Sequence, residues 1–465
     1  MIENLEPSFK IINPATGAPI GEVAFASETE IDNTLENLHT GFKKWKKFSV
    51  KERQQKLSIV IEALKKSKAE FAQLITQTMG KPIAQSEAEF DKTVDAAEYL
   101  CSQDWSVLKT RSVADTKRRH EIRREPIGII VGVMPWNYPI WQAMRMIFPS
   151  LIGGNTVLLK HAELTAPVGE LLARLFQDLN RDVTVFQHVM FSHILTERIV
   201  ADARVGGISI TGSIRAGRAI GEIAGRQLKK AVLELGGSDP SLVFSDCHLE
   251  SSVKAILRSR FLNSGQVCIA TKRVFVERTI LQKFLDQTLT QFRTYKADDP
   301  TKSTTKIGPL AHLKFKNEFL QQMQAVGLYS QIIAENKLDI APFESAFVSP
   351  KILLFDRHVE FFKTNEIFGP ALCVIPFDSE NDALKMANST IFGLGASIYT
   401  TNNTRIENLT RDIESGQISV NNFVSSDVKL PFGGQKQSGL GRELGEDGFL
   451  EFCQTKVVSY ELESP

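Results

Sequence analysis

Three residues that could carry out acyl chemistry lie far apart in the chain. Cys268 follows a stretch of small and polar residues, and a cysteine thiolate is a strong nucleophile. Glu234 leads into two glycines and could act as a general base. Asn137 lies in a turn between two prolines, where its side-chain amide could donate to an oxyanion. Together they predict covalent chemistry at a carbonyl carbon, although each alone also fits a structural role.

The other cysteines are interpreted as buried small residues. None of the five forms a C-x-x-C pair, and none is grouped with histidines at ligand spacing. This pattern disfavours a disulfide framework and a metal site, and it favours a reducing, cytoplasmic compartment. The four are Cys101, Cys247, Cys373 and Cys453.

Length and charge limit the classes of function. At 465 residues the chain is too long for a single core, so we expect two or three domains. The formal net charge of +1 gives no field suited to nucleic acid or acidic membranes. The acidic start Met1–Glu6 does not resemble a targeting peptide, and no apolar run is long enough to cross a bilayer. The sequence therefore predicts neither a nucleic-acid nor a membrane partner.

Two basic stretches remain to be explained. Lysines flank Trp45, and a solvated helix face with the indole turned inward explains them better than a nucleic-acid patch. Residues 117–125 could form an RNA-binding arm, but they contain balancing acids and lack interleaved aromatics. An exposed ribbon that packs on another subunit is the favoured interpretation.

The pattern of elements predicts an α/β fold. Residues 11–32 read as a strand pair and 30–80 as helices, with a further helix over 84–108. From residue 126 strands alternate with helices, which is typical of an open, mostly parallel sheet. A second α/β unit follows Glu234, and the tail Thr455–Glu461 reads as an edge strand.

A loop typical of phosphate binding follows one of these strands. Thr211–Gly217 leaves a predicted strand and begins a helix. Gly212 allows a tight turn, and Ser213 can cap the helix and offer its hydroxyl and N–H to a phosphate. Gly217 leaves a helix face bare for close packing on the sheet. A simple strand–helix turn remains the alternative at this point.

Seven motifs together resemble those of the aldehyde dehydrogenase superfamily over nearly the whole chain. The tryptophan–glutamine pair at 141–142, the lysine–histidine pair at 160–161 and the run 234–240 are similar to the short succinate-semialdehyde dehydrogenase branch. The seven are Pro135–Pro139, Lys160, Gly212–Gly217, Glu234–Gly237, Gly265–Cys268, Glu366–Pro370 and Pro431–Gly441.

The resemblance implies a role for each candidate catalytic residue. The Cys268 thiolate attacks the aldehyde, and the Asn137 amide and the Cys268 N–H hold the resulting oxyanion. Loss of a hydride leaves a thioester, which a water activated by Glu234 hydrolyses. The implied reaction is oxidation of a small semialdehyde, with succinate semialdehyde expected as the substrate.

The resemblance also implies a dinucleotide cofactor. Lys160 would contact the adenosine ribose, Ser213 the diphosphate and Glu366 the nicotinamide ribose. Relatives in this branch often have serine where this chain has Glu163. A carboxylate there accepts from ribose hydroxyls and repels a 2′-phosphate, so we predict NAD rather than NADP. The full expected set is Pro135, Trp136, Lys160, Glu163, Gly212, Ser213, Gly217, Leu235, Glu366 and Phe368.

The substrate is less well specified. By resemblance, Arg145 and Ser426 would bind the distal carboxylate of the aldehyde. Some succinate-semialdehyde dehydrogenases have a second arginine where this chain has Leu262. That difference favours a broad-specificity aliphatic or aromatic aldehyde dehydrogenase as the alternative. Acyl transfer to phosphate or coenzyme A is a further alternative, against which Glu234 argues, since such transfer needs no base that activates water. A non-catalytic paralogue is another, and the three catalytic residues argue against it.

The implied architecture has three parts and no metal. A Rossmann-like NAD-binding domain would comprise residues 1–109 and 126–233, and a second α/β catalytic domain residues 234–428. Residues 110–125 and 440–465 would form an oligomerisation ribbon. Because such a ribbon would expose unpaired strand edges, a homodimer or homotetramer is expected.

Overall fold

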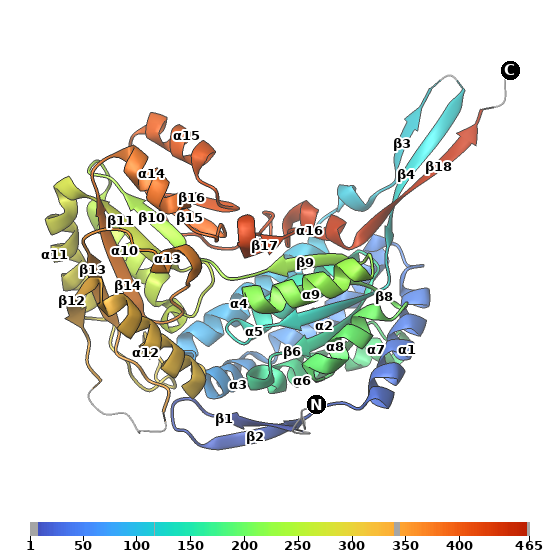
Figure 1. Ribbon diagram of the computed structural model, residues 1–465. Coiled ribbons are helices and arrows are strands. Elements are labelled where there is room, and N and C mark those ends of the chain that lie inside the picture. The colour runs from blue at the N-terminus through green and yellow to red at the C-terminus, as the bar shows by residue number, and fades with distance from the viewer. Residues whose placement is uncertain (1–7, 116, 339–344, 463–465) are drawn as a thin grey trace.

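The computed structural model describes residues 8–115, 117–338 and 345–462, and within them the strands form two large parallel-rich sheets and two smaller ones (Figure 1). The alternation of strands and helices predicted from residue 126 is confirmed. Among these residues no helix is both long and apolar enough to cross a membrane.

The first large sheet has six strands in the order β17-β9-β8-β5-β6-β7. All neighbours are parallel except β17, which pairs antiparallel with β9 at one edge. The strands are β5 (Ile129–Met134), β6 (Thr156–His161), β7 (Phe186–His188), β8 (Val205–Thr211), β9 (Lys230–Glu234) and β17 (Gly439–Leu440).

Helices cover both faces of this sheet because its strands are apolar on both sides. In β5, Ile130 packs into one buried cluster with α2 to α6, whereas Ile129 and Val131 pack into another with α1, α8 and α9. The helices are α1 (Glu28–Trp45), α2 (Val50–Lys65), α3 (Lys68–Met79), α4 (Ile83–Ser102), α5 (Pro139–Ile152), α6 (Ala166–Leu175), α7 (Gln177–Asp182), α8 (His193–Ala201) and α9 (Ile214–Arg226).

The second large sheet has seven strands in the order β12-β13-β14-β11-β10-β15-β16. It is parallel apart from β12, which pairs antiparallel with β13. Its strands are β10 (Asp239–Val243), β11 (Thr271–Glu277), β12 (Ser330–Glu335), β13 (Lys351–Phe355), β14 (Ala371–Phe377), β15 (Gly395–Tyr399) and β16 (Gln417–Val420). The helices of this part are α10 (Leu249–Phe261), α11 (Leu281–Phe292), α12 (Leu313–Gly327), α13 (Phe361–Thr364), α14 (Glu380–Asn388) and α15 (Asn403–Asp412), and α16 (Gly445–Glu451) leads into the C-terminal strand.

A three-stranded ribbon projects from the body of the molecule (Figure 1). It joins β3 (Arg111–Ala114), β4 (Arg118–Pro126) and β18 (Cys453–Glu461), with β4 in the middle. The predicted ribbon and the predicted C-terminal edge strand are thus confirmed. Packing of the ribbon on another subunit, and the three domain boundaries, stay predictions.

The N-terminal part differs from the sequence prediction. The strand pair β1 (Ser8–Ile12) and β2 (Pro19–Ala24) ends well before residue 32, because Ser27 and Glu30 form a capping box that starts α1 at Glu28. A second capping box at Ser49 starts α2 and divides the helical stretch predicted over 30–80. The helix predicted over 84–108 ends at Ser102.

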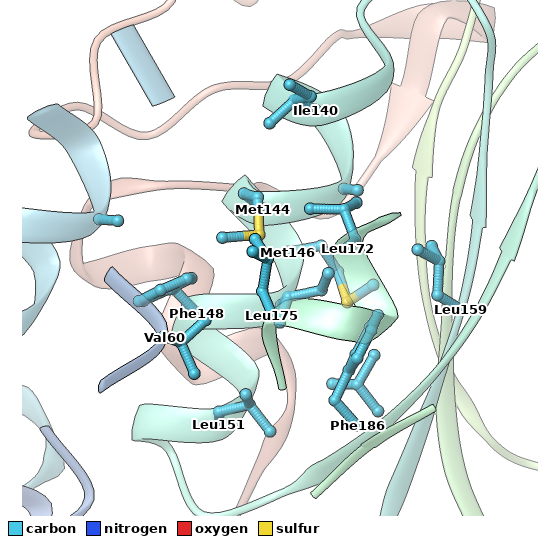
Figure 2. Packing of buried hydrophobic residues seen from close by; sticks show 14 of the residues in the cluster. Val60, Ile140, Met144, Met146, Phe148, Leu151, Leu159, Leu172, Leu175 and Phe186 are labelled. Carbon is cyan, nitrogen blue, oxygen red and sulfur yellow. The ribbon is translucent and has the colours of Figure 1, made fainter. Parts of the chain in front are cut away.

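Helix α5 is central to the arrangement of the candidate site. All of its residues are buried, and Met144, Met146, Phe148 and Leu151 pack with Val60 of α2 and other apolar side chains (Figure 2). A Cβ on Gly132 of β5 would lie 2.2 Å from the Met146 side chain, so this glycine lets the helix approach the sheet. The helix is therefore firmly held, and so are the residues at its N-terminus.

Candidate active site

One cleft brings together residues from both halves of the chain. Nine of the residues predicted from the sequence line this cavity of about 290 Å³, including Cys268 and Asn137. The other seven are Pro135, Trp136, Gly212, Ser213, Leu235, Glu366 and Phe368. Further lining residues lie outside every sequence motif, namely Phe315, Glu318, Phe319 and Gln322.

The loop before Cys268 has an unusual backbone that the fold holds in place. Asn263, Ser264 and Gly265 all have positive φ angles, of 50°, 55° and 76°. A Cβ on Gly265 would lie 2.4 Å from the Gly369 carbonyl oxygen, so only glycine fits there. The Ser264 hydroxyl donates to the Gly308 carbonyl at 2.9 Å. The thiol is thus presented by a fixed turn that closes with a glycine.

The surroundings of the Cys268 thiol oppose its ionisation. Burial raises its pKa to about 11, against the opposing positive charges of Lys272 and Arg145. Lys272 also donates to the carbonyls of Val267 and Cys268, so it fixes the loop as well as adding charge. No sequence motif indicated this lysine, which lies four residues after the cysteine.

Asn137 lines the same cavity as the Cys268 thiol. Its side-chain amide donates to the Gln266 carbonyl at 2.9 Å, and its own carbonyl accepts from the Asn263 amide at 2.9 Å. An amide carries two hydrogens, so the second remains for an oxyanion. Asn263, which no motif had indicated, therefore ties the two halves of the site together.

A buried ion pair fixes the turn that carries Asn137. Lys81 and Glu89 form a contact in which both side chains are almost fully buried. The other Glu89 oxygen accepts from the backbone N–H groups of Ile140 and Trp141, at 3.0 and 3.1 Å, in the first turn of α5. A carboxylate is favourable there, because helix N-termini present unpaired donors and a partial positive charge.

Glu234 ends β9 and is 2% exposed. Burial, with the negative charge of Glu443 adding, raises its pKa well above the ordinary carboxyl value. A Cβ on Gly433 would lie 2.9 Å from a Glu234 oxygen, so the glycine-rich loop leaves room for this carboxyl group. A raised pKa brings the group closer to the pH at which a general base works well.

The residues predicted to bind a dinucleotide fit that ligand. The Ser213 hydroxyl accepts from the Ala216 N–H at 3.2 Å and caps α9, whose N-terminus faces the cleft. Free N–H groups of a helix N-terminus suit a diphosphate. A Cβ on Gly217 would lie 2.4 Å from the Leu235 side chain, so this glycine allows the helix to pack closely.

Lys160 and Glu163 lie at the carboxyl edge of β6, where open sheets bind ligands. Lys160 Nζ donates to a Glu163 oxygen at 2.7 Å. Burial opposes ionisation of Glu163, but the charge and hydrogen bond of Lys160 outweigh it and hold the pKa below the ordinary value. The half-buried carboxylate is therefore ionised and could accept from a ribose.

The side of the cleft that carries Glu366 is also held by Lys272, Gln322 and Phe315, which no sequence motif had indicated. Lys272 Nζ lies 3.0 Å from a Glu366 oxygen, and Gln322 donates to the Glu366 carbonyl at 2.7 Å. Trp136 contacts Phe368 edge-on and stacks on Phe315. These contacts form an aromatic wall beside Glu366.

The two predicted substrate residues have partners within the protein. Arg145 is 4% exposed, and its Nε lies 2.5 Å from a Glu443 oxygen. Ser426 accepts a hydrogen bond from Lys92 at 2.8 Å. A role for either residue in binding a substrate carboxylate stays a prediction, and at Arg145 the substrate would have to compete with Glu443.

The comparison with known families settles the class of the protein. A model described as the aldehyde dehydrogenase family matches residues 2–458. The chain belongs to the aldehyde dehydrogenase family. Its fold is accordingly the aldehyde dehydrogenase fold, with parallel sheets and many helices.

Relatives of this aldehyde dehydrogenase include enzymes named for one substrate. It is 34% identical to the succinate semialdehyde dehydrogenase [NAD(P)+] of Escherichia coli over 454 residues, which cover 96% of each chain. It is 33% identical to the succinate-semialdehyde dehydrogenase [NADP(+)] of Deinococcus radiodurans, over 97% of this chain and 95% of the relative.

A solved structure of the same kind is also similar. The succinic semialdehyde dehydrogenase of Streptococcus pyogenes, in complex with NADP+, superposes with a TM-score of 0.92 at 30% identity. The match covers 97% of this aldehyde dehydrogenase and 99% of that chain. In the part of the chain that the structure describes, no three His, Cys, Asp or Glu side chains gather as a metal site.

Proposed function

We propose that this aldehyde dehydrogenase oxidises a small semialdehyde, succinate semialdehyde first among them, to the carboxylic acid with NAD. The observation that supports this best is the shared cleft. It places the Cys268 thiol and the Asn137 amide beside Ser213, Glu366 and Phe368, the residues expected to hold a dinucleotide. The names of the relatives support the choice of substrate.

The chain's own residues account for the covalent steps. The Cys268 sulfur bonds to the aldehyde carbon, and the Asn137 amide and the Cys268 N–H stabilise the oxyanion of the thiohemiacetal. Loss of the aldehyde hydrogen as hydride converts this adduct into a thioester. Glu234 then takes a proton from water as the water attacks the thioester, which releases the acid and the thiolate. NAD, when bound, supplies the hydride acceptor and a positive charge that favours the thiolate.

NAD is proposed over NADP because of Glu163, although several relatives are named for NADP. Replacing Glu163 with serine is expected to shift the ratio of kcat/KM values toward NADP by about tenfold or more. The change removes a carboxylate that would repel the 2′-phosphate of NADP. It also frees Lys160 from its hydrogen bond to Glu163, so that the lysine can pair with that phosphate. Steady-state rates with both cofactors measure the shift.

A matched control for this change is Glu170→Ser, which removes an exposed glutamate from α6. The control should leave the ratio of the two cofactors unchanged. A wild-type kcat/KM that is higher with NADP than with NAD would contradict the proposed preference.

A panel of aldehydes tests the proposed substrate class. We expect a higher kcat/KM for succinate semialdehyde than for butanal, which has the same chain length without the carboxylate. Equal values for the two would favour the alternative of a broad-specificity enzyme, which the apolar residue at Leu262 supports. Thioester transfer to phosphate or coenzyme A is disfavoured, because Glu234 supplies a base for hydrolysis.

The assembly and compartment belong to the same proposal. Val113 of β3 and Val457 of β18 are exposed, at 47% and 60%, on the two outer strands of the ribbon. Exposed apolar side chains on outer strands suit pairing with another copy of the chain. We therefore propose a homodimer or homotetramer that acts in the cytoplasm.

A further inference from the structure

Lys92 of α4 is a cation held beside the predicted substrate residue Ser426. Its ammonium donates to both the hydroxyl and the carbonyl oxygen of Ser426, each at 2.8 Å. The two residues are 334 positions apart, so the pair joins α4 to the loop before the glycine-rich segment. An ammonium has three hydrogens, and the two bonds to Ser426 leave one to donate elsewhere.

Trp141 links this cation to the cluster against which the thiol packs. Lys92 Nζ lies 4.1 Å from the centre of the Trp141 ring, and Trp141 is buried at 4% exposure. Trp141 packs in one cluster with Leu394 and Phe432, against which Cys268 and Val428 also pack. Neither Lys92 nor Trp141 lines the cleft of the dinucleotide residues. Cys268 thus borders both that cleft and the apolar cluster of Trp141, on whose ring Lys92 lies.

The charge of Lys92 is not neutralised by an ion pair. Among the residues that the structure describes, it forms a salt bridge with none, and its hydrogen-bond partners at Ser426 are neutral. Burial, with the nearby charge of Arg145 adding, lowers its pKa to about 8, while Glu89 and Asp427 oppose that effect. A half-buried ammonium of this kind gains from an added anion. Arg145 differs, because its guanidinium already forms an ion pair with Glu443, with a nitrogen–oxygen distance of 2.5 Å.

We propose that Lys92, together with Ser426, binds the distal carboxylate of the substrate and sets the preference for semialdehydes. This rests on the proposed function and names the residue that recognises its substrate class. The carboxylate would accept the remaining Lys92 hydrogen and the Ser426 hydroxyl, while the aldehyde end reaches Cys268 past Trp141. Arg145 remains in its pair with Glu443 and adds positive charge without direct contact.

Two variants separate the charge of Lys92 from its structural tie to Ser426. Lys92→Met removes both, whereas Lys92→Gln keeps a donor for Ser426 and removes only the charge. For both we expect the ratio of kcat/KM for succinate semialdehyde to that for butanal to fall about 10- to 100-fold, the usual effect of a lost hydrogen bond to a charged group. The loss should appear as a higher KM, and Lys92→Arg should restore most of the preference.

The matched control is Lys429→Met. Lys429 is an exposed lysine three residues after Ser426, and its ammonium lies over the Tyr99 ring. We expect this control to leave the ratio unchanged, which would exclude a general effect of positive charge near Ser426. Inhibition by succinate, compared with butyrate, gives a second readout, and it should weaken in Lys92→Gln but not in the control.

Three outcomes would overturn the proposal. Lys92→Gln could retain the wild-type preference, or it could lower kcat/KM for both aldehydes by the same factor, which would show a structural role only. Alternatively, Arg145→Gln could abolish the preference while Lys92→Gln keeps it, which would make Arg145 the receptor. In each case a wild-type preference for the semialdehyde would leave the proposed function standing. Equal wild-type rates with the two aldehydes would instead refute the proposed substrate class, and with it the role of Lys92.

Discussion

Replacing Cys268 with alanine is expected to lower the rate of aldehyde-dependent NADH formation by about 10⁴-fold or more. Loss of a nucleophile that carries a covalent intermediate has effects of this size, because no other group can form the adduct that gives up hydride. The side chain is small and half-buried, so the change should leave the fold intact. The rate is measured by absorbance of NADH with succinate semialdehyde and with butanal.

The same variant should still bind the cofactor. Trp136 lines the cleft beside the expected nicotinamide site, so quenching of tryptophan fluorescence by NADH reports binding without turnover. Cys247→Ala is the matched control, since Cys247 is also a half-buried free cysteine and plays no part in the site. It should keep activity within about twofold of wild type. Activity of Cys268→Ala within tenfold of wild type would contradict the nucleophile and support a different reaction.

Sequence motifs identified the parts of the site whose chemistry is local in the chain. Cys268 and Asn137 each lie in a short run of residues that together determine the backbone turn, and the cleft brings these runs together. The alternation of strands with helices also predicted the two parallel sheets, because apolar runs bounded by turns are a strong signal. In each of these cases, residues that are neighbours in the sequence determine the local structure by themselves.

Pairs formed across the fold were not predictable in the same way. Lys81 lies just before α4 and Glu89 lies within it, yet the importance of this pair comes from the distant N–H groups of α5. The sequence predicted that Arg145 binds the substrate, but in the structure it forms an ion pair with Glu443, which lies almost 300 residues later. A buried charge is costly unless it is paired, but the partner cannot be identified from the sequence alone.

The electrostatics of the site depend equally on burial. The resemblance implied a thiolate nucleophile at Cys268, whereas desolvation raises the pKa of its thiol to about 11. The same effect raises the pKa of Glu234. Both shifts arise because a low-dielectric surrounding disfavours a charge, and neither can be read from residue types alone. Both groups therefore lose their protons less readily in the site than they would in water.

Replacing Glu234 with glutamine is expected to separate the two halves of the reaction. Glutamine cannot take a proton from water, so hydrolysis of the thioester should slow by about 10²- to 10⁴-fold. Formation of the thioester does not need this base, so one NADH per active site should still appear in a rapid burst. Stopped-flow absorbance followed by the steady-state rate measures both phases in one experiment.

The pH dependence of the slow phase provides an independent check. A base works only when it is deprotonated, so thioester hydrolysis in the wild type should rise with pH and level off above the Glu234 pKa, which burial places above the ordinary carboxyl range. Glu234→Gln should lack this rise, whereas Glu250→Gln, which alters an exposed glutamate of α10, should keep both the rise and the rate. If the burst disappeared together with steady-state turnover, Glu234 would act before the thioester forms, and its carboxylate would then have to take the proton of the Cys268 thiol.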